Sequence, residues 1–255
     1  MRIYYVGESR SRNLSVATAL GVDGEHWNAV SEHVLDWRWV MEDEFNVPTG
    51  RVLRGEVLLS PSGSPLPRGR RNSQPTLEEG LEIMMTGLRV LEHSMNNRGA
   101  IGVINVCRPN SLYRQHRRRD RAAARQRLLE LVNASLAADG RYGQIIEDEA
   151  ERDGLPALAA GPVQRDPIRA AHPYAEDGED GGDIRPDTAV RVQRYRRAGD
   201  DELLQMAGLV SYALLQQDEP TAMAEALNFH LAFGILKSVL DRRACPQDPQ
   251  GVDRM

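Results

Sequence analysis

This sequence has almost no lysine, few cysteines and no long apolar run. The two cysteines, at positions 107 and 245 of a 255-residue chain, are too few for a disulfide framework, so we expect free thiols in a cytoplasmic protein. No apolar stretch approaches the roughly 18 residues that a membrane span needs. The first residues enter a strand pattern directly, and we therefore expect no signal peptide. With 41% hydrophobic and 27% charged residues, the chain has the composition of an ordinary globular protein.

Lys237 is the only lysine, so nearly all of the positive charge is arginine. The formal net charge of −5 argues against binding of nucleic acid through overall charge. The basic residues are nevertheless concentrated, most strongly in the segment RQHRRRDRAAARQR at 114–127. Arginine binds phosphate in a fork geometry that lysine does not match, although a GC-rich genome would produce the same bias.

The hydrophobic pattern predicts an α/β protein that opens with two strands. Residues 2–7 and 13–22 are rich in β-formers and their connection is short and polar, so the simplest arrangement is an antiparallel hairpin. Thr76 and Glu79 predict a capping box at the start of a helix. Further strands are expected at 51–60, 100–107, 142–150 and 189–197, and helices at about 25–45, 76–96, 114–138, 201–217 and 222–243.

This order of elements predicts one mixed sheet flanked by helices. We assign residues 1–243 to a single domain. Residues 151–188 have little periodicity and much proline, glycine and aspartate, which indicates a long loop or insertion. The tail at 244–255 is expected to be disordered.

Acidic residues stand where three predicted strands end: Glu8, Glu56, and the pair Asp148 and Glu149. In an open α/β sheet, the ends of the strands converge on a common site. Convergent carboxylates are what two Mg²⁺ or Mn²⁺ ions about 4 Å apart need for phosphodiester cleavage. The simpler alternative is that these acids only face water.

Three short motifs follow one another along the chain: Gly-Glu-Ser at 7–9, Glu-Asp-Glu at 147–149 and Gln-Met-Ala-Gly at 205–208. Their order resembles the bacterial family catalogued as domain of unknown function 3800, which is similar to ribonuclease H-like nucleases. In that family the first strand ends Asp-Glu-Ser-Gly, a later strand ends Asp-Glu, and a closing helix begins Gln-Leu-Ala-Asp. The resemblance covers most of residues 1–217 and implies a ribonuclease H-like fold with a Mg²⁺- or Mn²⁺-dependent nuclease site.

Glycine occupies two positions at which this resemblance implies an aspartate ligand, Gly7 and Gly208. A metal site on the family plan would keep Asp148, with Glu8 as a weak further ligand. Glu8 adjoins Gly7, but successive strand residues point to opposite faces, so Glu8 would need a bulge to turn inward. Asp201 lies two helical turns, about 10 Å, before Gly208 and is too far away to replace it. The two glycines could instead leave space for a partner.

The best candidate for a binding surface is a stripe of arginines on the helix expected at 114–138. Its members recur at a spacing of three and four residues: Arg114, Arg117, Arg118, Arg121 and Arg125. Such a stripe suits a phosphate backbone and predicts salt-dependent binding of DNA or RNA. Arginine-rich helix faces are also commonly just solvated, or paired with acids.

Three functional hypotheses follow. The first is a degenerate ribonuclease H-like protein that needs no cofactor and binds nucleic acid, or a protein partner as an assembly component, in a mobile-element or defence system. The second is an active nuclease that uses Glu8, Glu56, Asp148 and Glu149 with Mg²⁺ or Mn²⁺. The third is a purely structural subunit of an oligomer.

Overall fold

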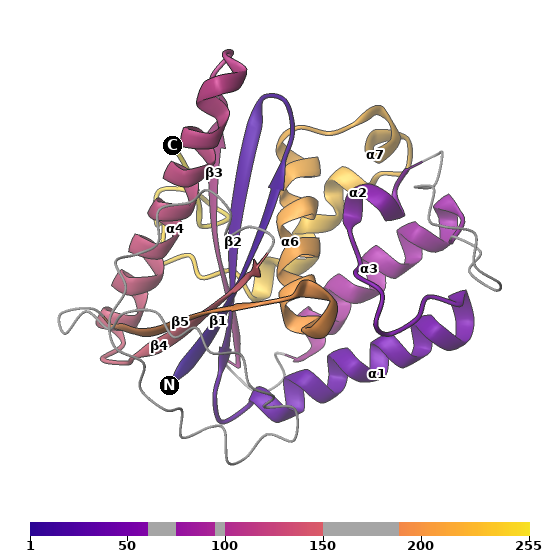
Figure 1. Ribbon diagram of the computed structural model, residues 1–255, viewed down its shortest axis with the longest axis horizontal. Coiled ribbons are helices and arrows are strands. Elements are labelled where there is room, and N and C mark those ends of the chain that lie inside the picture. The colour runs from indigo at the N-terminus through magenta and orange to yellow at the C-terminus, as the bar shows by residue number, and fades with distance from the viewer. Residues whose placement is uncertain (61–74, 95–99, 150–188) are drawn as a thin grey trace.

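A six-stranded mixed sheet forms the centre of the computed structural model, which describes residues 1–60, 75–94, 100–149 and 189–255 (Figure 1). The strands lie in the order β5-β4-β1-β2-β3-β6. Neighbours among β1, β2 and β3 are antiparallel, whereas β4, β5 and β6 run parallel to the strands they pair with. The bounds are β1 Arg2–Arg10, β2 Leu14–Asp23, β3 Ile101–Pro109, β4 Gly143–Asp148, β5 Val190–Arg196 and β6 Val252–Arg254.

Helices cover both faces of this sheet (Figure 1). On one face, α6 (Glu202–Asp218) packs directly on β1 and β2, with α1 (Trp27–Phe45) and α3 (Leu77–His93) packed behind it. On the other face lies α4 (Arg117–Ala138), against β2 and β3. The mixed sheet flanked by helices and the antiparallel hairpin of β1 and β2 are therefore confirmed.

Alternation along β1 separates two hydrophobic clusters. Ile3 and Tyr5 belong to the cluster that includes α6, whereas Tyr4 and Val6 belong to the cluster that includes α4. Because successive strand residues point to opposite faces, Gly7 lies on the α6 side and Glu8 on the α4 side. The two residues at the centre of the sequence motif are thus directed away from each other.

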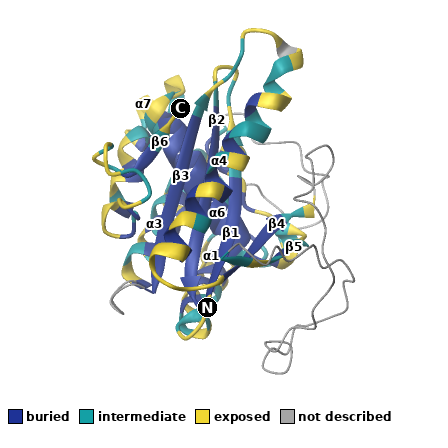
Figure 2. Cartoon of the chain, turned by 90° about the vertical axis from the view of Figure 1, so that its left-hand side faces the viewer, coloured by how far each residue is buried: buried dark blue, intermediate teal, exposed yellow. Residues whose placement is uncertain are grey.

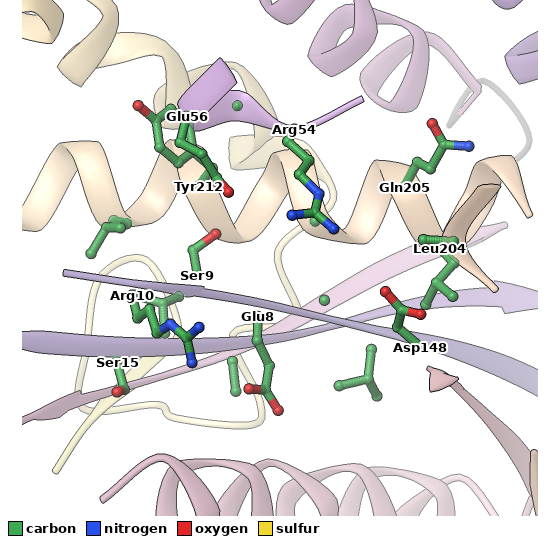
Figure 3. Close-up of a pocket in the computed structure, with 18 of the residues that line it drawn as sticks. Glu8, Ser9, Arg10, Ser15, Arg54, Glu56, Asp148, Leu204, Gln205 and Tyr212 are labelled. Carbon is green, nitrogen blue, oxygen red and sulfur yellow. The ribbon is translucent and has the colours of Figure 1, made fainter. Parts of the chain in front are cut away.

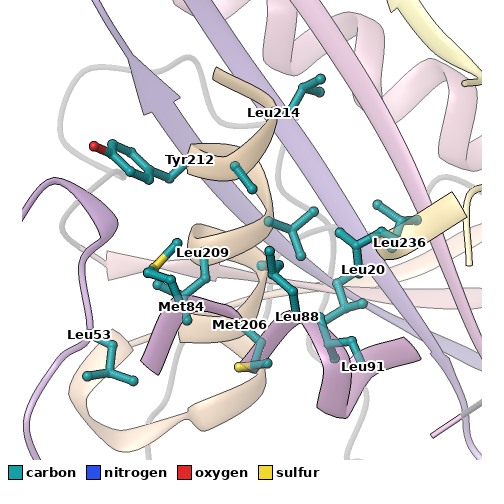
Figure 4. Packing of buried hydrophobic residues seen from close by; sticks show 14 of the residues in the cluster. Leu20, Leu53, Met84, Leu88, Leu91, Met206, Leu209, Tyr212, Leu214 and Leu236 are labelled. Carbon is teal, nitrogen blue, oxygen red and sulfur yellow. The ribbon is translucent and has the colours of Figure 1, made fainter. Parts of the chain in front are cut away.

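The helix α6 is buried on nearly all sides, because it lies between the sheet and the outer helices. Met206 and Leu209 of α6 pack close to Met84 and Leu88 of α3 (Figure 4). Asp201 caps the start of α6, where its carboxylate accepts a hydrogen bond of 3.0 Å from the Leu204 N–H. An apolar helix of this kind belongs in a core, and its position decides what can reach the neighbouring end of β1.

Two predictions that rest on local spacing are confirmed. The capping box at the start of α3 is present, with Thr76 and Glu79 each bonding the backbone of the other. The helix expected at about 25–45 is present as α1, and Val30, Val34 and Met41, which recur at a helical spacing, are buried on one face of it. Short-range patterns of this kind depend only on residues within one or two helical turns.

Two segments have a different secondary structure from the one expected. The strand expected at 51–60 contains instead the short helix α2 (Gly55–Leu58). The helix expected at 222–243 is divided into α7 (Ala222–Ala226) and the 3₁₀ helix η5 (Phe229–Ser238), separated by Asn228 in the left-handed conformation, with φ of 55°. A short apolar run does not by itself distinguish a strand from a helix, and hydrophobic spacing does not reveal a left-handed residue.

The prediction of a disordered tail at 244–255 is wrong. The strand β6 pairs in parallel with β3, and Val252 is completely buried there. Arg254 adds an ion pair of 3.0 Å with Asp218 at the end of α6. These partners come from distant parts of the chain, so the polar composition of the tail could not reveal them.

Three remaining predictions concern the membrane, the cysteines and the insertion. No helix in the described part of the chain is both long and apolar enough to cross a bilayer. Cys107 and Cys245 are both free, and burial raises the pKa of the Cys107 thiol, which disfavours a nucleophilic thiolate there. The insertion expected at 151–188 lies outside the described residues.

Candidate functional site

A pocket of about 390 Å³ lies where β1 continues past the end of β4 (Figure 3). β4 pairs with β1 only as far as Val6 and Glu147, whereas β2 pairs with β1 as far as Arg10. On the β4 side, the last residues of β1 therefore border an opening, whereas on the other side they stay paired with β2. Charged residues from several elements line this opening: Glu8, Arg10, Arg54, Glu56, Arg121 and Asp148.

The pocket brings together three of the four acids that the sequence singled out. Asp148 lies at the end of β4, Glu56 approaches from the α6 side and Glu8 from the α4 side (Figure 3). Within the described residues, these three carboxylates are not close enough together to share one ion. Glu149 does not line the pocket. It is exposed and its carboxylate lies 3.4 Å from Nε of Arg197, so the structure does not bring it together with the other three acids.

Another group of side chains is close enough together to hold a metal ion, but at the other end of β1 and β2. It consists of Asp23, Glu25 and His26. The Asp23 carboxylate already accepts two hydrogen bonds from Arg141, at 2.9 and 3.0 Å. Groups of acidic side chains near a surface are common without any ion, so the geometry assigns no function to this group.

The two glycines of the sequence motifs meet at the wall of the pocket. A Cβ atom on Gly7 would lie within 3.0 Å of the backbone of Ala207 and Gly208, which shows how closely β1 approaches α6. At Gly208, by contrast, an added Cβ would meet nothing within 4 Å, because this position faces the pocket. The space left by Gly7 is therefore filled by this chain's own helix and is not available to a partner.

The carboxylate of Glu8 is paired with an arginine of the same chain. Its carboxylate accepts a hydrogen bond from Nε of Arg121 in α4, and the side chains of both residues are largely buried. Burial raises the pKa of Glu8, although Arg121 opposes this effect. The residue thus lies on the face opposite to Gly7, as strand alternation predicts, and its carboxylate is bonded to a cation of the same chain.

The predicted stripe of five arginines is not a single exposed surface. Arg114 belongs to the 3₁₀ turn η2 (Arg114–His116), and α4 begins only at Arg117. Arg125 is buried and donates to both carboxylate oxygens of Glu147, at 2.6 Å from Nε to Oε1. Arg121 faces the pocket and Glu8, so only the beginning of α4 keeps exposed arginines, among them Arg118.

The geometry also shows pocket residues that the sequence did not indicate. Arg10 at the end of β1, Arg54 beside α2 and Tyr212 of α6 all line the pocket. None belongs to a motif or follows a periodic pattern, so no sequence signal marked them. Gln205 was part of a motif, and its side-chain oxygen accepts a hydrogen bond of 2.9 Å from the Leu53 N–H, which holds the segment before α2 against α6.

Comparison with known proteins gives no match to any family, to any curated protein or to any solved structure. The resemblance to ribonuclease H-like proteins therefore stays a prediction, and the functional argument rests on the geometry of the chain itself.

The first turn of α4 provides a test of the local electrostatics. Asp120→Asn keeps a neutral acceptor and is expected to reduce the free energy of unfolding by about 1 kcal/mol near pH 7, because a hydrogen bond to a charged group contributes about that much more than a neutral one. The Ser111 N–H donates to Asp120 at 2.7 Å and lowers the pKa of this carboxyl. A lowered folded-state pKa contributes stability above the unfolded pKa of about 3.9 and loses it as the pH falls through the folded value.

Urea unfolding of the wild-type protein and the variant at a series of pH values measures this effect. We expect the difference between them to shrink below about pH 4, where the folded-state carboxylate becomes protonated. A difference that stays constant down to low pH would contradict the assignment of this hydrogen bond to the ionised side chain.

Proposed function

We propose that this chain is a ribonuclease H-like protein whose metal site is dismantled, and that it binds nucleic acid without cleaving it. The observation that carries the proposal is the meeting of positions 7, 148 and 208 at one pocket, although up to 201 residues separate them in the sequence. The resemblance implies a carboxylate at each of these positions. In this chain, two of the three are glycine.

The remaining side chains are a poor set of ligands for a pair of hard cations. Mg²⁺ and Mn²⁺ in nuclease sites take several carboxylate oxygens that converge on two ions. Here Asp148 is the carboxylate left at a matching position, while Glu8 is bonded to Arg121 and Glu56 enters from the other face of the sheet. The packing of Gly7 against α6 also leaves no room for an aspartate to return at that position.

The positive side chains around the pocket support binding of a polyanion. Arg10 and Arg54 line the pocket, and Arg118 and Arg119 are exposed at the beginning of α4, within one helical turn of Arg121 of the pocket. Because the whole chain carries a net charge of −5, phosphates would be attracted by this local surface and not by the protein as a whole. A cytoplasmic role in a mobile-element or defence system, with nucleic acid or a protein as partner, belongs to the same proposal.

The proposal predicts binding without cleavage. The full chain is incubated with single- and double-stranded DNA and RNA in the presence of Mn²⁺ or Mg²⁺, and binding is measured by fluorescence anisotropy at low and high salt. We expect no metal-dependent cleavage, and binding that weakens steeply with salt. Replacing both Arg118 and Arg119 by alanine should reduce the slope of log affinity against log salt by about 1 for each lost phosphate contact.

Arg89→Ala is the matched control, because Arg89 is exposed on α3 at the other side of the sheet. This variant should bind as the wild-type protein does. Metal-dependent cleavage that disappears in Asp148→Asn would overturn the proposal in favour of an active nuclease. Failure to bind any nucleic acid at low salt, together with a defined oligomer in light scattering, would favour the purely structural subunit.

A further inference from the structure

We propose that the segment between β3 and α4 presents an aromatic side chain for stacking on unpaired bases, so that the ligand is single-stranded nucleic acid. This inference rests on the proposed function and specifies its ligand. The segment, residues 110–119, is named here the stacking tip. It extends from the end of the sheet at the beginning of α4, where exposed residues are concentrated (Figure 2).

Two large apolar side chains are exposed on the stacking tip. Leu112 is 91% exposed and Tyr113 is 68% exposed, which are the highest values among the large hydrophobic residues of the described chain. Tyr113 makes an edge-on contact with His116 at 5.7 Å between ring centroids, so much of the ring stays open to solvent. Tyrosine has an apolar ring and a polar hydroxyl, and this residue type is enriched at interfaces.

The stacking tip is held in place by specific hydrogen bonds. The Asn110 N–H donates to Asn13 O at 2.6 Å, and its carboxamide oxygen accepts from Ser15 at 2.7 Å. The Ser111 N–H donates to Asp120 in the first turn of α4, and after Tyr113 the His116 N–H donates to Tyr113 O at 2.9 Å. Because the backbone is already fixed, stacking on Tyr113 would cost little conformational entropy.

The charges around Tyr113 favour a polyanion over an apolar protein surface. The first three residues of α4 are arginines, and Arg118 and Arg119 are exposed. Arg117 lies four residues, or about 6 Å along the helix axis, before Arg121 of the pocket, so a bound strand could run from one to the other. Basic side chains interleaved with an exposed aromatic ring are the usual arrangement in proteins that bind single strands.

The strandedness of the ligand follows from the geometry of the bases. In a duplex the bases are stacked on each other and only their edges are accessible, so a side chain that stacks on a base face needs an unpaired base or must force a step open. Tyr113 is one ring on an exposed turn, and the apolar surface around it is small. The stacking tip therefore fits a single strand better than a duplex.

The test compares a single-stranded oligonucleotide with a blunt duplex of the same length. Tyr113→Ala should weaken single-strand binding by about tenfold, as loss of one base-aromatic stack does, and should leave duplex binding within about twofold. Tyr113→Phe should bind as the wild-type protein does, since it keeps the ring. Tyr142→Ala, at a tyrosine 53% exposed beyond the other end of α4, is the matched control.

Circular dichroism and thermal unfolding of each variant separate loss of binding from loss of folding. If the wild-type protein binds nucleic acid but Tyr113→Ala binds single strands equally well, the proposed role of the stacking tip is overturned while the proposed function stands. The same holds if Tyr113→Ala weakens single strands and duplexes alike, or if it converts a dimer of the wild-type protein to a monomer in light scattering. If the wild-type protein binds no nucleic acid, both proposals fail.

Discussion

Gly7→Asp is expected to abolish stable folding, whereas Gly208→Asp is expected to be tolerated. The new side chain at Gly7 would begin within 3.0 Å of the backbone of Ala207 and Gly208 and would place a carboxylate in a buried position. Backbone cannot move aside as a flexible side chain does, so α6 would have to separate from β1. We expect a loss of about 4 kcal/mol or more in the free energy of unfolding, which is typical of a substitution that overpacks the core and buries a charge.

Gly208 provides the matched comparison on the facing element. A side chain introduced at this position would enter the pocket, because an added Cβ would meet nothing within 4 Å. Gly208→Ala should stabilise the protein by about 0.5–1 kcal/mol, because glycine is a poor residue inside a helix. Urea or thermal unfolding measures the stability of the alanine and aspartate variants at both Gly7 and Gly208. Folding of Gly7→Asp with wild-type stability would contradict the close packing of β1 on α6.

This pair of variants bears directly on why glycine occupies the two motif positions. If Gly7 only marked decay of a catalytic residue, the position would be expected to accept a range of small side chains. The contact with α6 makes glycine a requirement of the present packing instead. The two motif glycines therefore have different explanations, one structural and the other an open position on a pocket wall.

Breaking the buried ion pair between Arg125 and Glu147 is expected to destabilise the protein by about 3–5 kcal/mol. Both residues are at most 4% exposed, and Glu147 also accepts a hydrogen bond from Gln193 of β5. Arg125→Ala would leave the Glu147 charge buried without its partner, which is the costly outcome. Urea unfolding measures the loss.

The double variant Arg125→Met with Glu147→Leu should cost less than Arg125→Ala, because no buried charge would remain. Arg119→Ala is a matched control on the same helix. Since Arg119 is exposed, its removal should change stability by no more than about 0.5 kcal/mol while weakening nucleic-acid binding. A small effect of Arg125→Ala on stability would contradict the assignment of Arg125 to the interior.

These predictions divide the arginines of the basic segment into two groups, one largely buried and one exposed. Arg121 and Arg125 hold α4 to the strands through Glu8 and Glu147, whereas Arg118 and Arg119 are exposed in the first turn of α4. Loss of binding in an Arg125 variant would therefore follow from loss of structure. Mutational tests of binding should therefore replace the exposed arginines, and the folding of each variant should be checked independently.

Local spacing was sufficient to predict much of the fold. The β1–β2 hairpin, the capping box of α3 and the buried face of α1 depend on residues a few positions apart, and all are present. Of the four acids that the sequence singled out, only Asp148 ends a strand, since Glu8 lies within β1 and Glu56 lies in the short helix α2. Three of these acids line the same pocket.

Tertiary contacts decided the rest, because they join residues that are far apart in the chain. Only the packing of β1 on α6 shows that Gly7 must be a glycine, and only the approach of α4 to β4 buries Arg125 on Glu147. A helical repeat of arginines looks the same in the sequence whether it meets solvent or an acidic strand. The sequence thus specified which charged residues are present, whereas the fold determined which of them are paired in the interior and which lie on the surface.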